Sequence, residues 1–176
     1  MSSQNQPNKS DEYRLDINLK NYYDIATISN VKFFDIETTI GIVWIQSGDE
    51  PGIYVKFADL RVRNDKGSVI FGDREKIIDL PASARISRLE IVADSEEMIL
   101  GTVQTETEDN QSITKLRLSN YDILKKHSHH CMFFHLVGEV VDLRLFFEKS
   151  ADIKYKNASI FQKLNSDIII CPLRWH

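Results

Sequence analysis

One stretch of the sequence alternates between apolar and polar side chains with a period of two. Across residues 141–147 every second side chain is apolar, and Asp142 and Arg144 lie between them. A strand with one buried face has this period, and a helix does not. The preceding residues 132–137 are apolar at almost every position, which is typical of a strand covered on both faces. We therefore expect two strands within residues 130–147, at the centre of a β-fold.

Strand signals recur along most of the chain. Residues 13–19 alternate strictly, residues 31–46 are rich in β-branched and aromatic side chains, and residues 47–52 form a turn signal. Residues 167–171 are an apolar run stopped by Pro172, which predicts a buried strand. About ten short strands predict a mainly β, antiparallel β-sandwich with Greek-key or jelly-roll-like connectivity. A closed β-barrel is the alternative.

Two segments are candidate short helices. Residues 119–127 begin with Ser119 and Asn120, which can cap a helix, and Lys125 suits its C-terminal end. Residues 152–164 mix apolar and polar side chains in a pattern that fits a helix and a strand equally well. We predict one or two short helices in these places.

The length of 176 residues fits one domain with a core of its own. Residues 1–11 are polar and cannot bury apolar surface, so we expect a disordered tail there and a single β-sandwich domain over residues 12–176. The composition, 27% charged and 42% hydrophobic, is that of a globular protein.

The net charge and the hydropathy of the chain indicate which class of partner and which cellular compartment to expect. A net charge of −4 argues against a nucleic-acid binder, which would carry a basic excess. No secretory signal precedes the domain, and no apolar run approaches the roughly 18 residues of a membrane span. We therefore expect a cytoplasmic protein, with Cys131 and Cys171 as buried free thiols inside apolar runs.

Histidines are unevenly distributed. Four of the five lie within nine residues, and Cys131 is among them. On a regular strand His127, His129 and His135 share one face because even numbers of residues separate them. These three are candidate ligands for Zn or Fe. The alternative is that the strand simply enters the core, with His135 as a hydrogen-bonded core residue.

Acidic residues concentrate in a second segment. Residues 94–109 hold six carboxylates and no basic side chain. The carboxylates fall into two groups on either side of an expected strand, whereas hard-cation loops place their oxygen ligands close together. We interpret them as solvated turns.

Catalytic signatures are absent from the sequence, which has neither a G-x-S-x-G elbow nor a glycine-rich phosphate loop. Tyr22, Tyr23 and Trp175 are the aromatic residues most suited to an exposed partner contact. The sequence therefore favours a non-enzymatic protein that binds a protein partner or assembles with itself through exposed strands or an acidic surface. The alternatives are a metal-dependent enzyme or metal-binding protein that uses the histidines, and a carbohydrate-binding module.

Overall fold

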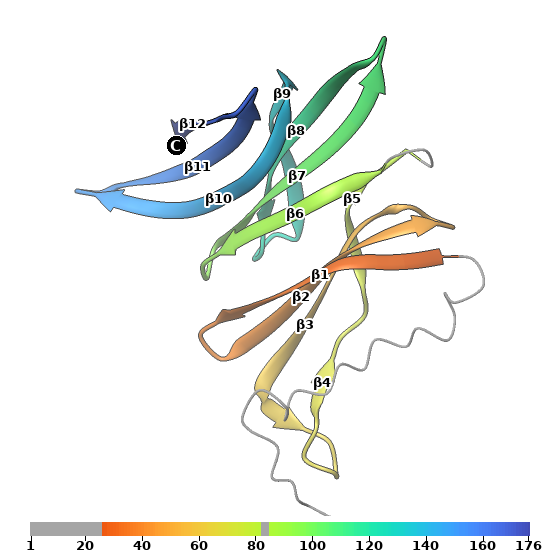
Figure 1. The fold of residues 1–176 in the computed structure, drawn as a ribbon. Helices are drawn as coiled ribbons and strands as arrows, with labels where there is room; N and C mark the ends of the chain where they lie inside the picture. Colours follow the sequence, from red (N-terminus) through yellow and green to blue (C-terminus); the bar gives the residue numbers. More distant parts are fainter. Residues whose placement is uncertain (1–25, 82–84) are drawn as a thin grey trace, which may run out of the picture. The chain divides into compact units, whose positions relative to one another are not determined.

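The computed structural model describes residues 26–81 and 85–176, except for the side chains of residues 26, 27, 106, 108, 111, 112, 130 and 131. This part of the chain forms twelve strands and no helix (Figure 1). All strand pairs are antiparallel, so the prediction of a mainly β, antiparallel fold is confirmed. Since the described segments are strands and turns, they include no helix that could cross a membrane.

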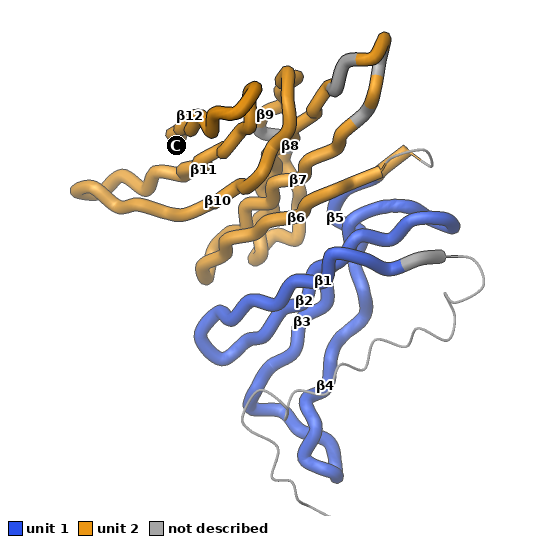
Figure 2. The backbone as a smooth tube through the Cα atoms, viewed as in Figure 1, with its two compact units in different colours: residues 1–79 blue, residues 80–176 orange. Residues whose placement is uncertain are grey.

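The chain divides into two compact units, Met1–Asp79 and Leu80–His176, which Figure 2 shows in different colours. Each unit has its own sheets and its own core. One domain over residues 12–176 stays a prediction. The tail predicted over residues 1–11 lies outside the described residues.

Unit 1 is a five-stranded antiparallel sheet. Its strands are β1 (Ala26–Ile36), β2 (Thr39–Gly48), β3 (Gly52–Arg63), β4 (Val69–Phe71) and β5 (Glu75–Asp79). The turn predicted at residues 47–52 joins β2 to β3, as expected. Both β4 and β5 pair with β3, β4 near its end and β5 near its beginning.

The core of unit 1 is organised around β2. Ile42, Val43 and Trp44 of this strand are fully buried, although their side chains point alternately to the two faces of the sheet. The Trp44 ring stacks on that of Tyr54 in β3, with ring centroids 5.8 Å apart. The continuous apolar run of β2 is therefore the mark of a strand covered on both faces.

Unit 2 contains two antiparallel sheets. The four-stranded sheet consists of β6 (Ile86–Ala93), β7 (Glu97–Glu108), β8 (Gln111–Asp122) and β9 (His127–Val137). The three-stranded sheet consists of β10 (Glu139–Ser150), β11 (Ile153–Leu164) and β12 (Asp167–Trp175). β10 lies against β6, β7 and β8, so the two sheets of unit 2 face each other (Figure 1).

The two sheets of unit 2 enclose one apolar core, which confirms the sandwich. Its buried members from both sheets are Val103, Leu116, Leu118, Val140, Leu143, Ala158 and Ile160. Gly101 lets the sheets approach closely, because a Cβ there would lie 2.7 Å from Leu143 Cδ2. Burial of such side chains stabilises the fold by about 1.5–3 kcal/mol each.

The connectivity differs from the Greek-key or jelly-roll prediction. Within each sheet of unit 2 the strands pair in the order of the sequence, so each sheet is a meander of hairpins. Each of the three sheets has unpaired edge strands in the described structure, so the alternative of a closed barrel is wrong. Alternation reports which face of a strand is buried, but it does not report which strands are neighbours, and this is why the connectivity was missed.

The helix predicted over residues 119–127 is wrong. Ser119 and Asn120 belong to β8, and the chain makes a single turn before β9 begins at His127. The Asp122 carboxylate accepts the backbone N–H of Lys125 at 2.9 Å, as a helix cap would. The capping contact therefore comes from Asp122 and not from Ser119 or Asn120, and it closes the β8–β9 hairpin.

The helix considered over residues 152–164 is also wrong, because this segment is β11. Ala158, Ile160 and Gln162 are buried at intervals of two. Gln162 is buried because its side-chain amide donates to the carbonyl oxygen of Val137 at 3.0 Å. A buried glutamine hides the period of two from a hydrophobicity pattern, which made helix and strand look equivalent.

The two strands expected within residues 130–147 exist, but they are not a central pair. β9 is an edge strand of the four-stranded sheet, and β10 begins the other sheet after Gly138, which has a φ of +101°. β9 is also not covered on both faces, since Phe133 and Val137 are exposed. The continuous apolar run therefore did not indicate a doubly buried strand.

Candidate interaction surface

The three histidines predicted as metal ligands do not lie on one face of β9. His135 is paired with Lys115 of β8, and His129 is paired with Asn120. Lys115 and Asn120 lie on opposite faces of β8 because an odd number of positions separates them. A bulge in β9 between residues 130 and 132 causes this change of face. The fold therefore brings His127 and His129 together and places His135 on the other face.

Within the described part of the chain, other elements contribute no third ligand to a metal site formed by the histidines. Among the side chains that the structure describes, no group of three or more histidine, cysteine, aspartate or glutamate residues is arranged to hold a metal ion. His127 and His129 are exposed, with ring centroids 4.6 Å apart, and His135 lies against Phe133 at 5.2 Å.

The three aromatic residues predicted to contact a partner have different outcomes. Tyr22 and Tyr23 lie outside the described residues. Trp175, at the end of β12, is half-buried and packs against the sandwich core, and its buried indole N–H has no hydrogen-bond partner among the described residues. Much of the tryptophan ring therefore stabilises the sandwich.

The most unusual surface of the described chain is β12. This strand ends the order β10–β11–β12, so only β11 pairs with it in the described structure. Ile168, Ile169 and Ile170 keep 64%, 43% and 56% of their surface exposed, and Cys171 is exposed as well. The buried strand predicted here is therefore an exposed edge, since the core reaches only the Leu173 end of β12.

Both faces of β12 carry this apolar surface. Ile169 is paired with Gln162 of β11, on the face that lines the core, whereas Ile170 is paired with Phe161, on the outer face. On the outer face the guanidinium of Arg144 lies 5.3 Å from the centre of the Phe161 ring. An edge strand with isoleucines on both faces is a template for pairing with another strand.

Pro172 determines which backbone groups of β12 are available. Proline has no N–H, so it fits a ladder where the N–H would point away from the neighbouring strand. The pairing with β11 is regular through Pro172, and successive residues direct their N–H groups to alternate sides. The N–H and C=O groups of Ile168 and Ile170 therefore point to the free side of β12. Pro172 was the signal in the sequence that could have identified an edge strand.

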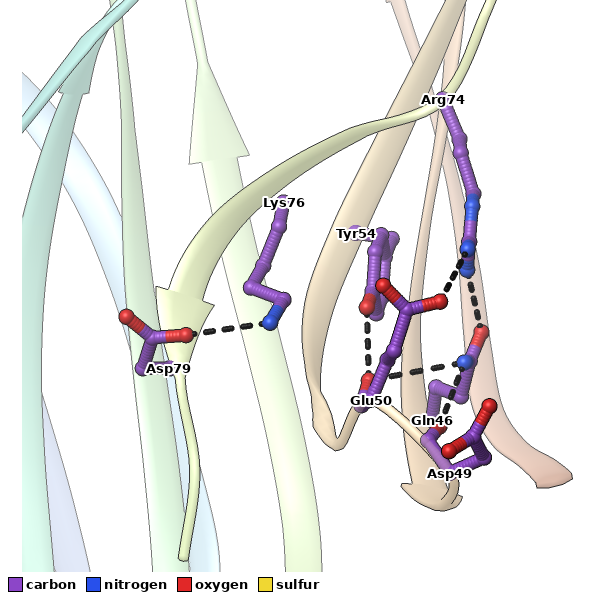
Figure 3. Close-up of polar contacts among 7 residues, drawn as sticks. All are labelled: Gln46, Asp49, Glu50, Tyr54, Arg74, Lys76 and Asp79. Atoms are coloured by element: carbon purple, nitrogen blue, oxygen red, sulfur yellow. Dashed lines mark hydrogen bonds and ion pairs between the residues drawn. The ribbon is translucent and has the colours of Figure 1, made fainter.

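A polar network in unit 1 is the other concentrated group of side chains (Figure 3). The guanidinium of Arg74 lies 4.5 Å from the centre of the Tyr54 ring, donates to Gln46 Oε1 at 2.8 Å and pairs with Glu50 at 3.2 Å. The Tyr54 hydroxyl donates to the carbonyl oxygen of Glu50 at 2.6 Å, and Gln46 Nε2 donates to that of Asp49 at 2.9 Å.

These contacts stabilise the β2–β3 turn, so the role of the network is structural. The side-chain oxygen and nitrogen of the buried Gln46 are both engaged within the network. Burial raises the pKa of Tyr54, although Arg74 and Lys76 oppose the shift, so the phenol stays protonated and keeps donating. Because the polar groups of this network form hydrogen bonds and ion pairs with one another, the network offers no open position for a ligand.

A second ionic network lies in unit 2 and corrects the interpretation of residues 94–109 as solvated turns. Lys154 of β11 bonds to Asp94 at 2.7 Å and to Glu97 at 2.5 Å, and Lys156 pairs with Glu97 at 3.2 Å. Asn120 donates to Glu97 at 2.7 Å. Two of the six carboxylates therefore neutralise lysines between the two sheets of the sandwich, which weakens the case for an acidic binding surface.

The charges of this network are held in their ionised forms. Burial alone would raise the pKa of Glu97, but hydrogen bonds from Lys154 and Asn120 outweigh it and the pKa is lowered. The pKa of Asp94 is lowered in the same way, by Lys154 and by backbone N–H donors against the effect of burial. Burial would lower the pKa of Lys154, yet its two carboxylate partners raise it.

Comparison with known proteins adds no relative. No family model matches the chain, and no similar curated protein or solved structure was found. The functional inference therefore starts from the surface of β12.

Proposed function

We propose that this chain is a non-enzymatic protein-binding module that associates through the free edge of β12, and that other copies of the chain are its partners. The observation that carries the proposal is the exposure of three consecutive isoleucines on an edge strand. Soluble proteins usually protect such edges with charges, bulges or a covering segment. β12 has no charged residue between Asp167 and Arg174.

Pairing between two copies suits this strand because its exposed segment is nearly symmetric. In an antiparallel pair centred on Ile169, Ile168 of each copy would lie opposite Ile170 of the other, and the two Ile169 side chains would face each other. This register uses the N–H and C=O groups that point to the free side of β12 and avoids Pro172. It covers apolar side chains on both faces and buries no charge.

A disulfide scan tests this register in the full-length chain. In a Cys171→Ser background we expect Ile169→Cys to cross-link two copies under mild oxidation, because residues opposite each other in a non-hydrogen-bonded pair have Cα atoms about 4.5 Å apart. The matched control is Ile168→Cys, which faces residue 170 of the other copy. Equal cross-linking of the two variants would contradict the proposed register.

Sedimentation equilibrium tests the association itself. We expect the wild-type chain to form dimers as its concentration rises and Ile170→Lys to remain monomeric, since a lysine there would place a charge within the pairing segment. Ile153→Lys is the matched control, because Ile153 is 44% exposed but lies on the central strand β11. A wild-type chain that stays monomeric would contradict pairing between copies and leave another protein as the partner.

A further inference from the structure

His127 and His129 lie side by side on an accessible strand. Both side chains are exposed, and their ring centroids are 4.6 Å apart. They are paired with Asp122 and Asn120, on the same face of the regular strand β8. Because β9 is an edge strand, one side of the histidine pair has no neighbouring strand in the described structure.

The separation of the two rings matches that of two ligands on one metal ion. A metal–nitrogen bond of about 2.0–2.1 Å places the ion about 3.2 Å from each ring centre. If the two metal–nitrogen bonds meet at a right angle, the ring centres lie about 4.5 Å apart. At a tetrahedral angle between these bonds the ring centres lie about 5.2 Å apart. The observed 4.6 Å falls within this range. The two rings meet edge to face, with their planes 84° apart, so metal binding requires a rotation that points one nitrogen of each ring to a common position.

The surroundings of the pair favour a cation with open coordination positions. Asp122 lies opposite His127 and carries a negative charge, although its Oδ1 already accepts the N–H of Lys125. Asn120 lies opposite His129, and its amide donates to Glu97. Since no group of three such residues is arranged around a metal ion in the described part of the chain, the two imidazoles would be the protein ligands and water would complete the coordination sphere. Imidazole ligands select Zn²⁺, Ni²⁺ and Cu²⁺ over Mg²⁺ and Ca²⁺.

We propose that His127 and His129 form a bidentate site for a divalent transition-metal ion on the edge strand β9, and that His135 takes no part in it. The site differs from the three-histidine arrangement that the sequence predicted, because the bulge in β9 turns His135 to the other face of the sheet. It is independent of the association through β12.

Titration of the full-length chain with ZnCl₂ near neutral pH, followed by isothermal calorimetry, tests the site. We expect one ion per chain, binding at least about tenfold weaker in His127→Ala and in His129→Ala, because each variant loses one of the two ligands. His135→Ala is the matched control and should bind as the wild type does. All three side chains are exposed, so circular dichroism should show the fold unchanged.

A second measurement identifies the ligands directly. Electron paramagnetic resonance of the Cu²⁺-loaded chain should show coupling to two nitrogen nuclei in the wild type and in His135→Ala, and to one in His129→Ala. The proposal is overturned if Zn²⁺ shows no saturable binding, or if either His127→Ala or His129→Ala binds as tightly as the wild type. It is overturned equally if His135→Ala loses as much affinity as His129→Ala does.

Discussion

Gly41 shows how a single residue shapes the sheet of unit 1. It lies in register between Phe34 of β1 and Phe57 of β3, whose ring centroids are 5.8 Å apart and edge to face. The Phe34 ring occupies the position that a side chain at residue 41 would need. Gly41 lies inside β2, and its missing side chain leaves the space that the Phe34 ring occupies.

Gly41→Ala should therefore destabilise the protein by about 1–3 kcal/mol, because the added methyl group overlaps the Phe34 ring and forces it to move. The free energy of unfolding in urea measures the effect. The control is Gly72→Ala, whose Cβ would meet only the carbonyl oxygen of Phe57 at 3.7 Å. If both alanines had the same effect, the packing of the ring would not be the cause.

The Glu97 network should make the stability depend on pH in acid. The pKa values of Glu97 and Asp94 are lower in the folded chain than their ordinary values of 4.5 and 3.8, so the stabilisation is present above these values and is lost as the pH falls through the folded pKa values. The pKa of Lys154 is raised above 10.5, so its contribution is present below that value and is lost only as the pH rises past it.

Glu97→Gln tests this network. We expect a loss of about 2 kcal/mol near neutral pH, because Lys154 and Lys156 lose charged hydrogen bonds at a site where all three side chains are mostly buried. The difference from the wild type should shrink as the pH falls through the lowered pKa of Glu97, where the wild-type glutamate also loses its charge. Urea unfolding over a series of pH values measures both effects, and a difference that is constant with pH would contradict the assignment.

At the scale of the element, the sequence predicted strands better than it predicted their surroundings. The β8–β9 turn carries the same signals as a helix end, with Asp122 as the cap and Lys126 at a φ of +54°, but it is too short to be a helix. In β12 the apolar run predicted burial, although burial depends on what lies beyond the strand. Local sequence reports the conformation of a segment, whereas its exposure depends on residues far away in the chain.

Pro172 gives an element-scale prediction about the free edge of β12. Pro172→Val supplies the missing N–H and a residue that favours strands. In the register centred on Ile169, however, residue 172 lies opposite residue 166 of the other copy, which is in the turn before β12. We therefore expect sedimentation equilibrium to show the same self-association for Pro172→Val as for the wild type. Pro81→Val, at an exposed position outside any strand, is the control and should also have no effect. Stronger association of Pro172→Val would contradict this register and indicate one that includes residue 172.

At the scale of the whole molecule, the antiparallel sandwich followed from the pattern of alternation, but its sequential connectivity and its ionic networks did not. Lys154 and Asp94 are far apart in the sequence, and nothing local to either residue indicates the other. The pair of histidines is an intermediate case. Their spacing was visible in the sequence, but the bulge that removes His135 from the set depends on the register between β8 and β9.

Association through β12 also predicts how the stability of the whole molecule responds to concentration. A partner that binds the folded chain and not the unfolded one stabilises the folded state by mass action. The Tm of the wild type should therefore rise with protein concentration, by several degrees for a gain of about 1–3 kcal/mol. Ile170→Lys should have a Tm that is independent of concentration, equal to that of the wild type at high dilution, because Ile170 is 56% exposed and contributes little to the core. Differential scanning calorimetry over a hundredfold range of concentration decides the matter, since a wild-type Tm that does not change with concentration would contradict association through this strand.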